Sequence, residues 1–157
     1  MITILGYNVR DTLDKFLWHF NHLTAEDRYC RFFSTLSAGA IRDWLIGVVD
    51  SDQHHTFIVS EDAKGNYTGI AQLAVNTVEN TADMTISVIP EVRGKGVAKA
   101  LVSEAIDKAR FLKLNKITFQ CELGNIPCRK LYESLGFTTA YDSEQRCVNG
   151  YLIFEAK

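Results

Sequence analysis

The chain has 157 residues, of which 46% are hydrophobic, and its formal net charge at pH 7 is −2. This length and apolar content suffice for one core, so we expect a single domain over residues 1–157. The slightly negative charge argues against nucleic acid as the main partner. No stretch approaches the roughly 18 apolar residues of a membrane span, and the first residues lack a leader pattern. We therefore expect no membrane partner and a cytoplasmic location.

The cysteines and histidines predict neither disulfides nor a metal site. The four cysteines are Cys30, Cys121, Cys128 and Cys147. They form no CxxC pair, so we expect reduced, mostly structural thiols. His19 and His22 share a helix face, and His54 adjoins His55, but no third ligand stands at a clear spacing. We expect no metal.

The first fifty residues predict one strand followed by three helices. Ile2 to Asn8 alternates loosely like a strand, and Asp11 to Phe20 shows helical spacing of apolar residues. Thr24 can cap a second helix, with Asp27 completing a near capping box. A third helix is expected over Ala38 to Val48. The apolar stripe of the second helix is predicted to be Tyr29, Phe32, Phe33 and Leu36. We interpret these helices as core and lid elements rather than a partner-binding face.

The middle of the chain changes to the period of strands. Thr56 to Ser60 and Thr68 to Val75 predict a hairpin around the turn residues 64–66. Apolar and polar residues alternate over Asp83 to Val88, which predicts a third antiparallel strand. A long helix is expected after the glycine-containing loop. Its apolar face is predicted to be Leu101, Val102, Ala105, Ile106, Ala109 and Leu112.

The loop before this long helix is a candidate phosphate site. The first turn of a helix has unpaired N–H groups and a partial positive charge. Gly94 and Gly96 remove side chains that would keep a phosphate away, and they allow backbone angles that turn several amides toward one point. Arg93 and Lys95 add positive charge. A glycine-rich loop alone could equally be a tight turn.

Two other phosphate motifs are excluded by this loop. A P-loop needs Ser or Thr after its Gly-Lys pair, but Lys95 is followed by Gly96. A dinucleotide fingerprint needs a third glycine, and Lys99 stands at that position. Neither a nucleotide triphosphate nor a dinucleotide site is therefore expected.

The remaining pattern resembles the Gcn5-related N-acetyltransferase (GNAT) superfamily. The pyrophosphate loop of that superfamily, [RQ]xxGx[GA], is matched by Arg93, Gly96 and Ala98. A second family pattern, N-x-x-[AC]-x-x-x-Y-x-x-x-G-F, is matched by Asn125, Cys128, Tyr132, Gly136 and Phe137. Residues 23–33 also resemble a segment of the acetyltransferase domains of bacterial protein-lysine acetyltransferases, whose protein substrates are not carried over. Two motifs in the family's order argue against a chance similarity.

The resemblance implies an α/β fold with a mixed, mostly antiparallel sheet. This GNAT-like sheet would have six or seven strands, be flanked by helices on both faces, and splay apart between strands 4 and 5. The remaining elements are expected over Lys116 to Glu122, Pro127 to Leu135, Thr138 to Asp142 and Val148 to Glu155. The gap between strands 4 and 5 would admit the cofactor.

The resemblance also implies acetyl-CoA as the acyl-donor cosubstrate. Backbone groups of Ser87 and Val88 would pair with its pantetheine arm, and Asn125 and Cys128 would face the pantetheine or the thioester. Its pyrophosphate would be held by Arg93, Gly94, Lys95, Gly96, Val97 and Ala98.

Acyl transfer to an amine needs a proton donor for the leaving thiolate and a base for the amine. Tyr132 suits the first task because its phenol is protonated at neutral pH; alternatively, it only packs on its helix. Some relatives have a glutamate where this chain has Gln120, which cannot accept a proton usefully. Glu122 or Asp83 could act as the base directly or through water. Glu122 could equally be a solvated carboxylate.

Three functions stay open from the sequence. The first is N-acetyl transfer from acetyl-CoA to a primary amine of a small molecule or protein. The second is a catalytically silent coenzyme A-binding regulatory module, and the third is a structural domain whose helices dock a partner. Tyr132 together with the intact loop favours the enzyme. Residues 141–149 could line the acceptor site, and a sheet edge could pair two copies into a homodimer.

Overall fold

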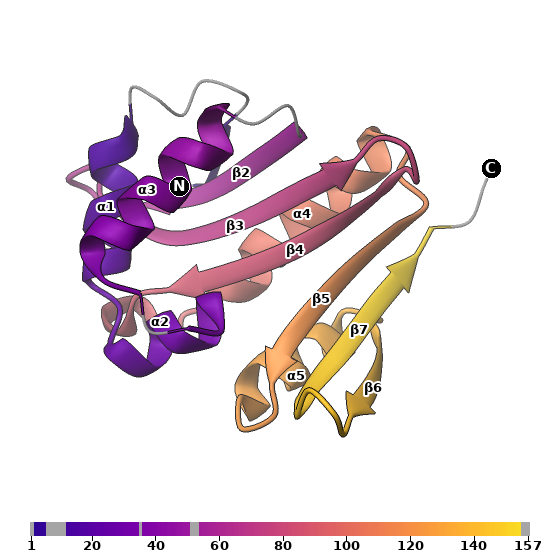
Figure 1. Ribbon diagram of the computed structural model, residues 1–157. Coiled ribbons are helices and arrows are strands. Elements are labelled where there is room, and N and C mark those ends of the chain that lie inside the picture. The colour runs from indigo at the N-terminus through magenta and orange to yellow at the C-terminus, as the bar shows by residue number, and fades with distance from the viewer. Residues whose placement is uncertain (1, 6–11, 35, 51–53, 155–157) are drawn as a thin grey trace.

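The computed structural model describes residues 2–5, 12–34, 36–50 and 54–154. One seven-stranded sheet has the order β1-β2-β3-β4-β5-β7-β6 (Figure 1). Its strands are β1 Ile2–Leu5, β2 His54–Glu61, β3 Tyr67–Asn76, β4 Thr81–Val88, β5 Lys116–Glu122, β6 Thr138–Asp142 and β7 Cys147–Ile153. All neighbouring pairs are antiparallel except β4 and β5. The predicted mixed, mostly antiparallel α/β fold is confirmed, with seven strands.

The sheet opens where β4 and β5 meet. Their parallel pairing covers only three residues of each strand, and it ends with Asp83 opposite Thr118. Beyond this point β4 continues to Val88 beside β3, and β5 continues to Glu122 beside β7. The two strands diverge visibly toward α2 and α5 (Figure 1). The expected splay between strands 4 and 5 is therefore present.

Helices cover both faces of the sheet (Figure 1). They are α1 Leu13–Asn21, α2 Ala25–Phe32, α3 Ala38–Asp50, α4 Val97–Phe111 and α5 Ile126–Ser134, with a short 3-10 turn η2 at Pro90–Val92. Side chains of α1 and α3 form one apolar cluster with β2 and β3, and α4 packs in a second cluster on the other face. Central strand β3 is buried along most of its length because both faces are covered.

The structure confirms most of the apolar face that was predicted for the long helix α4. The buried residues are Leu101, Val102, Ala105, Ile106 and Ala109. Leu112 was predicted to continue this face, but it follows the last helical residue and is 38% exposed. The face ends one turn earlier because the helix itself ends at Phe111.

Helix α2 begins as predicted but packs differently. The backbone N–H of Asp27 donates to the Thr24 hydroxyl, and Thr24 N–H donates back to the Asp27 carboxylate, which confirms the capping box. The predicted apolar stripe is wrong for Tyr29 and Phe33, which are 41% and 39% exposed. Phe33 adopts φ 55° and ends the helix. Helix α2 therefore lies over the sheet without burying a full face.

Some expectations fall outside the described residues. These are the predicted strand positions 6–8, the helix start at Asp11 and the strand end at Glu155. Within the described ranges, no helix combines the length and apolar character needed to cross a membrane. That residues 1–157 form one domain stays a prediction.

Candidate active site

A cavity of about 460 Å³ lies in the opening between β4 and β5. It is lined by residues of α2, β4, the loop before α4, the first turn of α4, β5 and α5. Of the predicted site residues, the lining includes Ser87, Val88, Arg93, Gly94, Gly96, Val97, Ala98, Asn125, Cys128 and Tyr132. Two motifs that are separated in sequence thus face one space.

The glycine loop leaves the start of α4 open toward this cavity. Gly94 and Gly96 have φ values of 76° and 79°, in the left-handed region that other residues rarely adopt. No side chain caps α4 at Gly96, so the first-turn amides of Val97 and Ala98 have no capping side-chain acceptor. A Cβ at either glycine would meet open space, so the loop is free on its outer side. This geometry suits an anionic group at the helix N-terminus.

Beyond Asp83, the edge of β4 that borders the cavity is not paired with β5. Ile89 N–H donates to Thr68 O, and backbone groups alternate between the two sides of a strand. The register with β3 therefore turns the backbone of Ser87 toward Ile70, and the groups of Ile86 and Val88 toward the gap. The predicted pairing position at Val88 thus faces the gap, with Ile86 rather than Ser87 beside it. The side chain of Ser87 lines the cavity.

Tyr132 reaches the cavity from α5 and is only 2% exposed. Its ring stacks on Phe119 of β5, with centroids 3.7 Å apart and an interplanar angle of 11°. Burial raises the pKa of Tyr132 well above its usual value, and neighbouring Cys128 and Cys121 act in the same direction. The phenol is therefore protonated at neutral pH, as a proton donor must be.

Asn125 and Cys128 form the start of α5. The Asn125 side chain accepts a hydrogen bond from the Cys128 backbone N–H at 3.3 Å and so caps the helix. The sulfurs of Cys121 and Cys128 are 2.7 Å apart, and both residues line the cavity. Contact with Cys128 and burial raise the pKa of the Cys121 thiol. Both thiols are free, as predicted.

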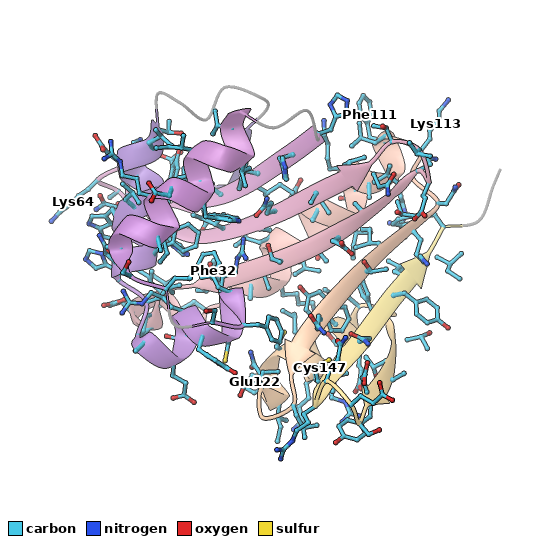
Figure 2. All side chains as sticks on the ribbon, viewed as in Figure 1. Phe32, Lys64, Phe111, Lys113, Glu122 and Cys147 are labelled. Carbon is cyan, nitrogen blue, oxygen red and sulfur yellow. The ribbon has the colours of Figure 1, made fainter. Side chains whose placement is uncertain are left out.

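Three predicted site residues do not line the cavity. Lys95 is exposed, as is Asp83, the alternative base. Glu122 lies at the end of β5, close to Cys147 of β7 and beneath α2 (Figure 2). Its carboxylate accepts a hydrogen bond from Cys30 at 3.1 Å. Glu122 as the base stays a prediction, and its carboxylate is one hydrogen bond away from a residue that does line the cavity.

Helix α2 contributes side chains that sequence reasoning missed. Asp27 pairs with Arg93 at 2.7 Å, and Arg93 also donates to Val88 O at 3.0 Å. Burial alone would raise the pKa of Asp27, but the bonds from Arg93 and Thr24 hold it below its usual value. The sequence predicts a capped helix in this segment, but a sequence pattern does not show where such a helix docks.

The same helix contacts β3 and β5. Arg31 Nη2 donates to Gln72 Oε1 of β3 at 2.8 Å, and Cys30 bonds Glu122 of β5. Burial and the Glu122 carboxylate raise the pKa of Cys30 to about 12, so this thiol stays protonated. Helix α2 is thus fixed to both sides of the opening and covers part of the cavity.

A buried histidine supports the β4 wall from behind. His19 of α1 is fully buried, with Nδ1 3.0 Å from Tyr67 O and Nε2 2.7 Å from Ser87 Oγ. A carbonyl oxygen can only accept, so Nδ1 carries the proton and Nε2 accepts from the Ser87 hydroxyl. Burial lowers the pKa of His19 to about 4. The neutral imidazole therefore orients the Ser87 side chain beside the cavity.

Among the described residues, no group of three or more His, Cys, Asp or Glu side chains could hold a metal ion. His19 and His22, considered above, have separate partners: Ser87 and Tyr67 for the former, and Trp18 O for the latter.

Curated proteins resemble part of this chain in sequence. A spermidine N(1)-acetyltransferase of Vibrio cholerae is 33% identical over 91 residues, which cover 57% of this chain and 52% of that protein. An N-acetylaspartate synthetase of Rattus norvegicus is 34% identical over 74 residues, which cover 46% of this chain and 25% of that protein. The matches thus span about half or less of these curated relatives.

Solved structures share the fold at low sequence identity. A spermidine N-acetyltransferase from Vibrio cholerae in complex with CoA and spermine has a TM-score of 0.76 at 22% identity, covering 97% of this chain and 95% of that one. The GNAT domain of S. lividans PAT has a TM-score of 0.76 at 16% identity, covering 98% and 89%. The model of the acetyltransferase (GNAT) family matches residues 16–137. The chain belongs to the acetyltransferase (GNAT) family.

Proposed function

We propose that the protein is an acetyl-CoA-dependent N-acetyltransferase acting on a primary amine. The observation that carries this proposal is one cavity bordered by a helix N-terminus without a side-chain cap, an edge of β4 that is not paired with β5, and a buried, protonated tyrosine. The spermidine and N-acetylaspartate enzymes among the relatives support an amine acceptor. The acceptor of this chain is a separate question.

The residues present fit coenzyme A. The amides of Val97 and Ala98 would hold the pyrophosphate, with Arg93 and Lys95 adding charge around Gly94 and Gly96. Backbone groups of Ile86 and Val88 would pair with the pantetheine amides as an added strand would. Asn125 and Cys128 would border the thioester end. Acetyl-CoA would supply an acetyl group activated as a thioester.

The protein's part in the chemistry is positioning and proton transfer. Tyr132 would donate its phenolic proton to the sulfur that leaves when the amine nitrogen takes the acetyl group. The stacking on Phe119 holds the phenol in place. Glu122 is the candidate acceptor of the amine proton. Positioned acid catalysis of this kind is typically worth about 10²–10⁴ in rate.

A thiol-release assay tests the proposal. Wild-type protein with acetyl-CoA and a panel of primary amines should release coenzyme A in an amine-dependent way. Tyr132→Phe should keep acetyl-CoA binding and lower kcat by about 10²–10⁴. Binding without release for any amine would instead indicate the regulatory module. No binding at all would indicate the structural domain.

A further inference from the structure

A second cavity of about 540 Å³ lies on the side of the sheet covered by α3. Its lining comes from the end of α2, from α3 and from β2, β3 and β4. Arg31 and Thr85 line both this cavity and the one between β4 and β5. The two cavities therefore adjoin at these side chains, so the second one is placed for the molecule that receives the acyl group.

Arg31 is a cation to which the described residues offer no anionic partner. Its guanidinium donates to the neutral Gln72 amide at 2.8 Å and lies 4.7 Å from the ring centre of Phe32 and 5.1 Å from that of Trp44. No ion pair joins Arg31 to a carboxylate of the described residues. Burial lowers the pKa of Arg31 to about 10, so it stays charged at neutral pH. Arg31 is half-buried, and a charge that is partly removed from water is usually paired.

Other polar side chains line the same cavity as Arg31. The Thr85 hydroxyl is buried and has no hydrogen-bond partner among the described residues. Arginine cannot accept, so Gln72 Oε1 accepts the hydrogen bond from Arg31, and the Gln72 NH₂ group donates to His55 Nδ1 at 2.9 Å. His55 then carries its proton on Nε2. Arg31 and His55 carry donors and line this cavity; Thr85 also lines it, with its hydroxyl oxygen buried.

Two carboxylates in the lining of this cavity further restrict the class of ligand that it could bind. Asp43 of α3 and Asp83 of β4 are exposed, whereas Arg31 lies deeper, packed between aromatic rings. A purely anionic ligand would be repelled by these carboxylates, and a simple polyamine would leave Arg31 unpaired. A molecule with both an amino group and a carboxylate matches both sets of charges.

We propose that this second cavity is the acceptor site, and that it takes an amino acid or similar short amine whose carboxylate pairs with Arg31. This inference rests on the proposed acyl transfer and names its substrate class. Arg31 would donate charge-assisted hydrogen bonds to the carboxylate oxygens. The ligand's nitrogen would then be held near the junction with the first cavity. Gln72 and Trp44 position the guanidinium from two sides.

Matched pairs of amines with and without a carboxylate test the proposal. Ornithine against putrescine and lysine against cadaverine differ only in that group. In the thiol-release assay, wild-type protein should use the carboxylated member with a kcat/KM about tenfold to hundredfold higher. Arg31→Gln should abolish this preference, mainly by raising KM. Arg42→Gln, which removes an exposed arginine of α3, should leave it unchanged.

Several results would overturn the proposal. Equal use of both members by wild-type protein would do so, as would a preference that survives in Arg31→Gln. An equal loss of kcat/KM for both members would indicate that Arg31 acts at the thioester or in folding instead. Arg31→Lys keeps the charge and should retain part of the preference, so it replaces Arg31→Gln if that variant does not fold.

Calorimetry separates this inference from the proposed function. If no amine supports turnover, binding of ornithine and putrescine is measured directly in the presence of coenzyme A. Arg31-dependent binding of ornithine alone would support the site although the transferase proposal had failed. Binding of neither amine, or of both equally, would overturn the acceptor assignment.

Discussion

Lowering the pH should destabilise the protein through one buried histidine. His19 is fully buried with both ring nitrogens engaged, and burial lowers its pKa from 6.5 to about 4. The unfolded chain binds a proton near pH 6.5, but the folded chain resists it until about pH 4. The stability that comes from the neutral form is therefore fully present above pH 6.5 and is lost as the pH falls toward 4.

The size of this effect follows from the two pKa values. A difference of about 2.5 between them corresponds to about 3 kcal/mol, since each pKa unit is about 1.4 kcal/mol. Between pH 7.5 and pH 5.0, this histidine should remove about 2 kcal/mol from the free energy of unfolding. The assay is urea denaturation at both pH values for wild type and His19→Gln.

The comparison between variants carries the test, because other groups also titrate in this range. Between the two pH values, the free energy of unfolding of His19→Gln should fall by about 2 kcal/mol less than that of wild type. His22→Gln, at the exposed C-cap of the same helix, should behave like wild type. Parallel losses in wild type and His19→Gln would refute the reasoning.

Two further predictions concern the walls of the cavity. A Cβ on Gly150 would overlap the ring of Phe119, which stacks on Tyr132. Gly150→Ala should therefore lower the free energy of unfolding by about 1–3 kcal/mol and also lower kcat. Gly124→Ala, where the added Cβ meets open space, should change neither quantity. Cys128 is half-buried and lines the cavity, so saturating acetyl-CoA should slow its alkylation by iodoacetamide at least about tenfold. Peptide mass spectrometry measures the alkylation rate. Normal stability of Gly150→Ala, or an unchanged alkylation rate, would contradict these expectations.

Local patterns predicted most of the fold. The alternation over Asp83 to Val88 lies within β4, the stripe from Leu101 to Ala109 is the buried face of α4, and Thr24 with Asp27 forms the capping box. These features depend on neighbours within a few residues, so periodicity and capping chemistry suffice. Leu112 was misplaced because the pattern does not fix the last residue of a helix.

The candidate site was predictable only where a motif supplied it. The loop at Gly94 and Gly96 and the Tyr132 segment line one cavity, as the resemblance implied. The α2 contacts were missed because they join residues far apart in the chain, such as Asp27 with Arg93 and Arg31 with Gln72. Such contacts depend on how a partly exposed helix docks, which composition and spacing do not encode.

The most direct test of the account is thermal unfolding with and without acetyl-CoA. At about a hundred times its Kd, the ligand should add roughly 2.7 kcal/mol of stability and raise the midpoint. Gly96→Glu, which places bulk and negative charge at the loop, should abolish the rise. Gly65→Glu, at the same kind of positive φ in the β2–β3 turn, should keep it. No rise in wild type, or an equal rise in Gly96→Glu, would contradict the assignment of this cavity to acetyl-CoA.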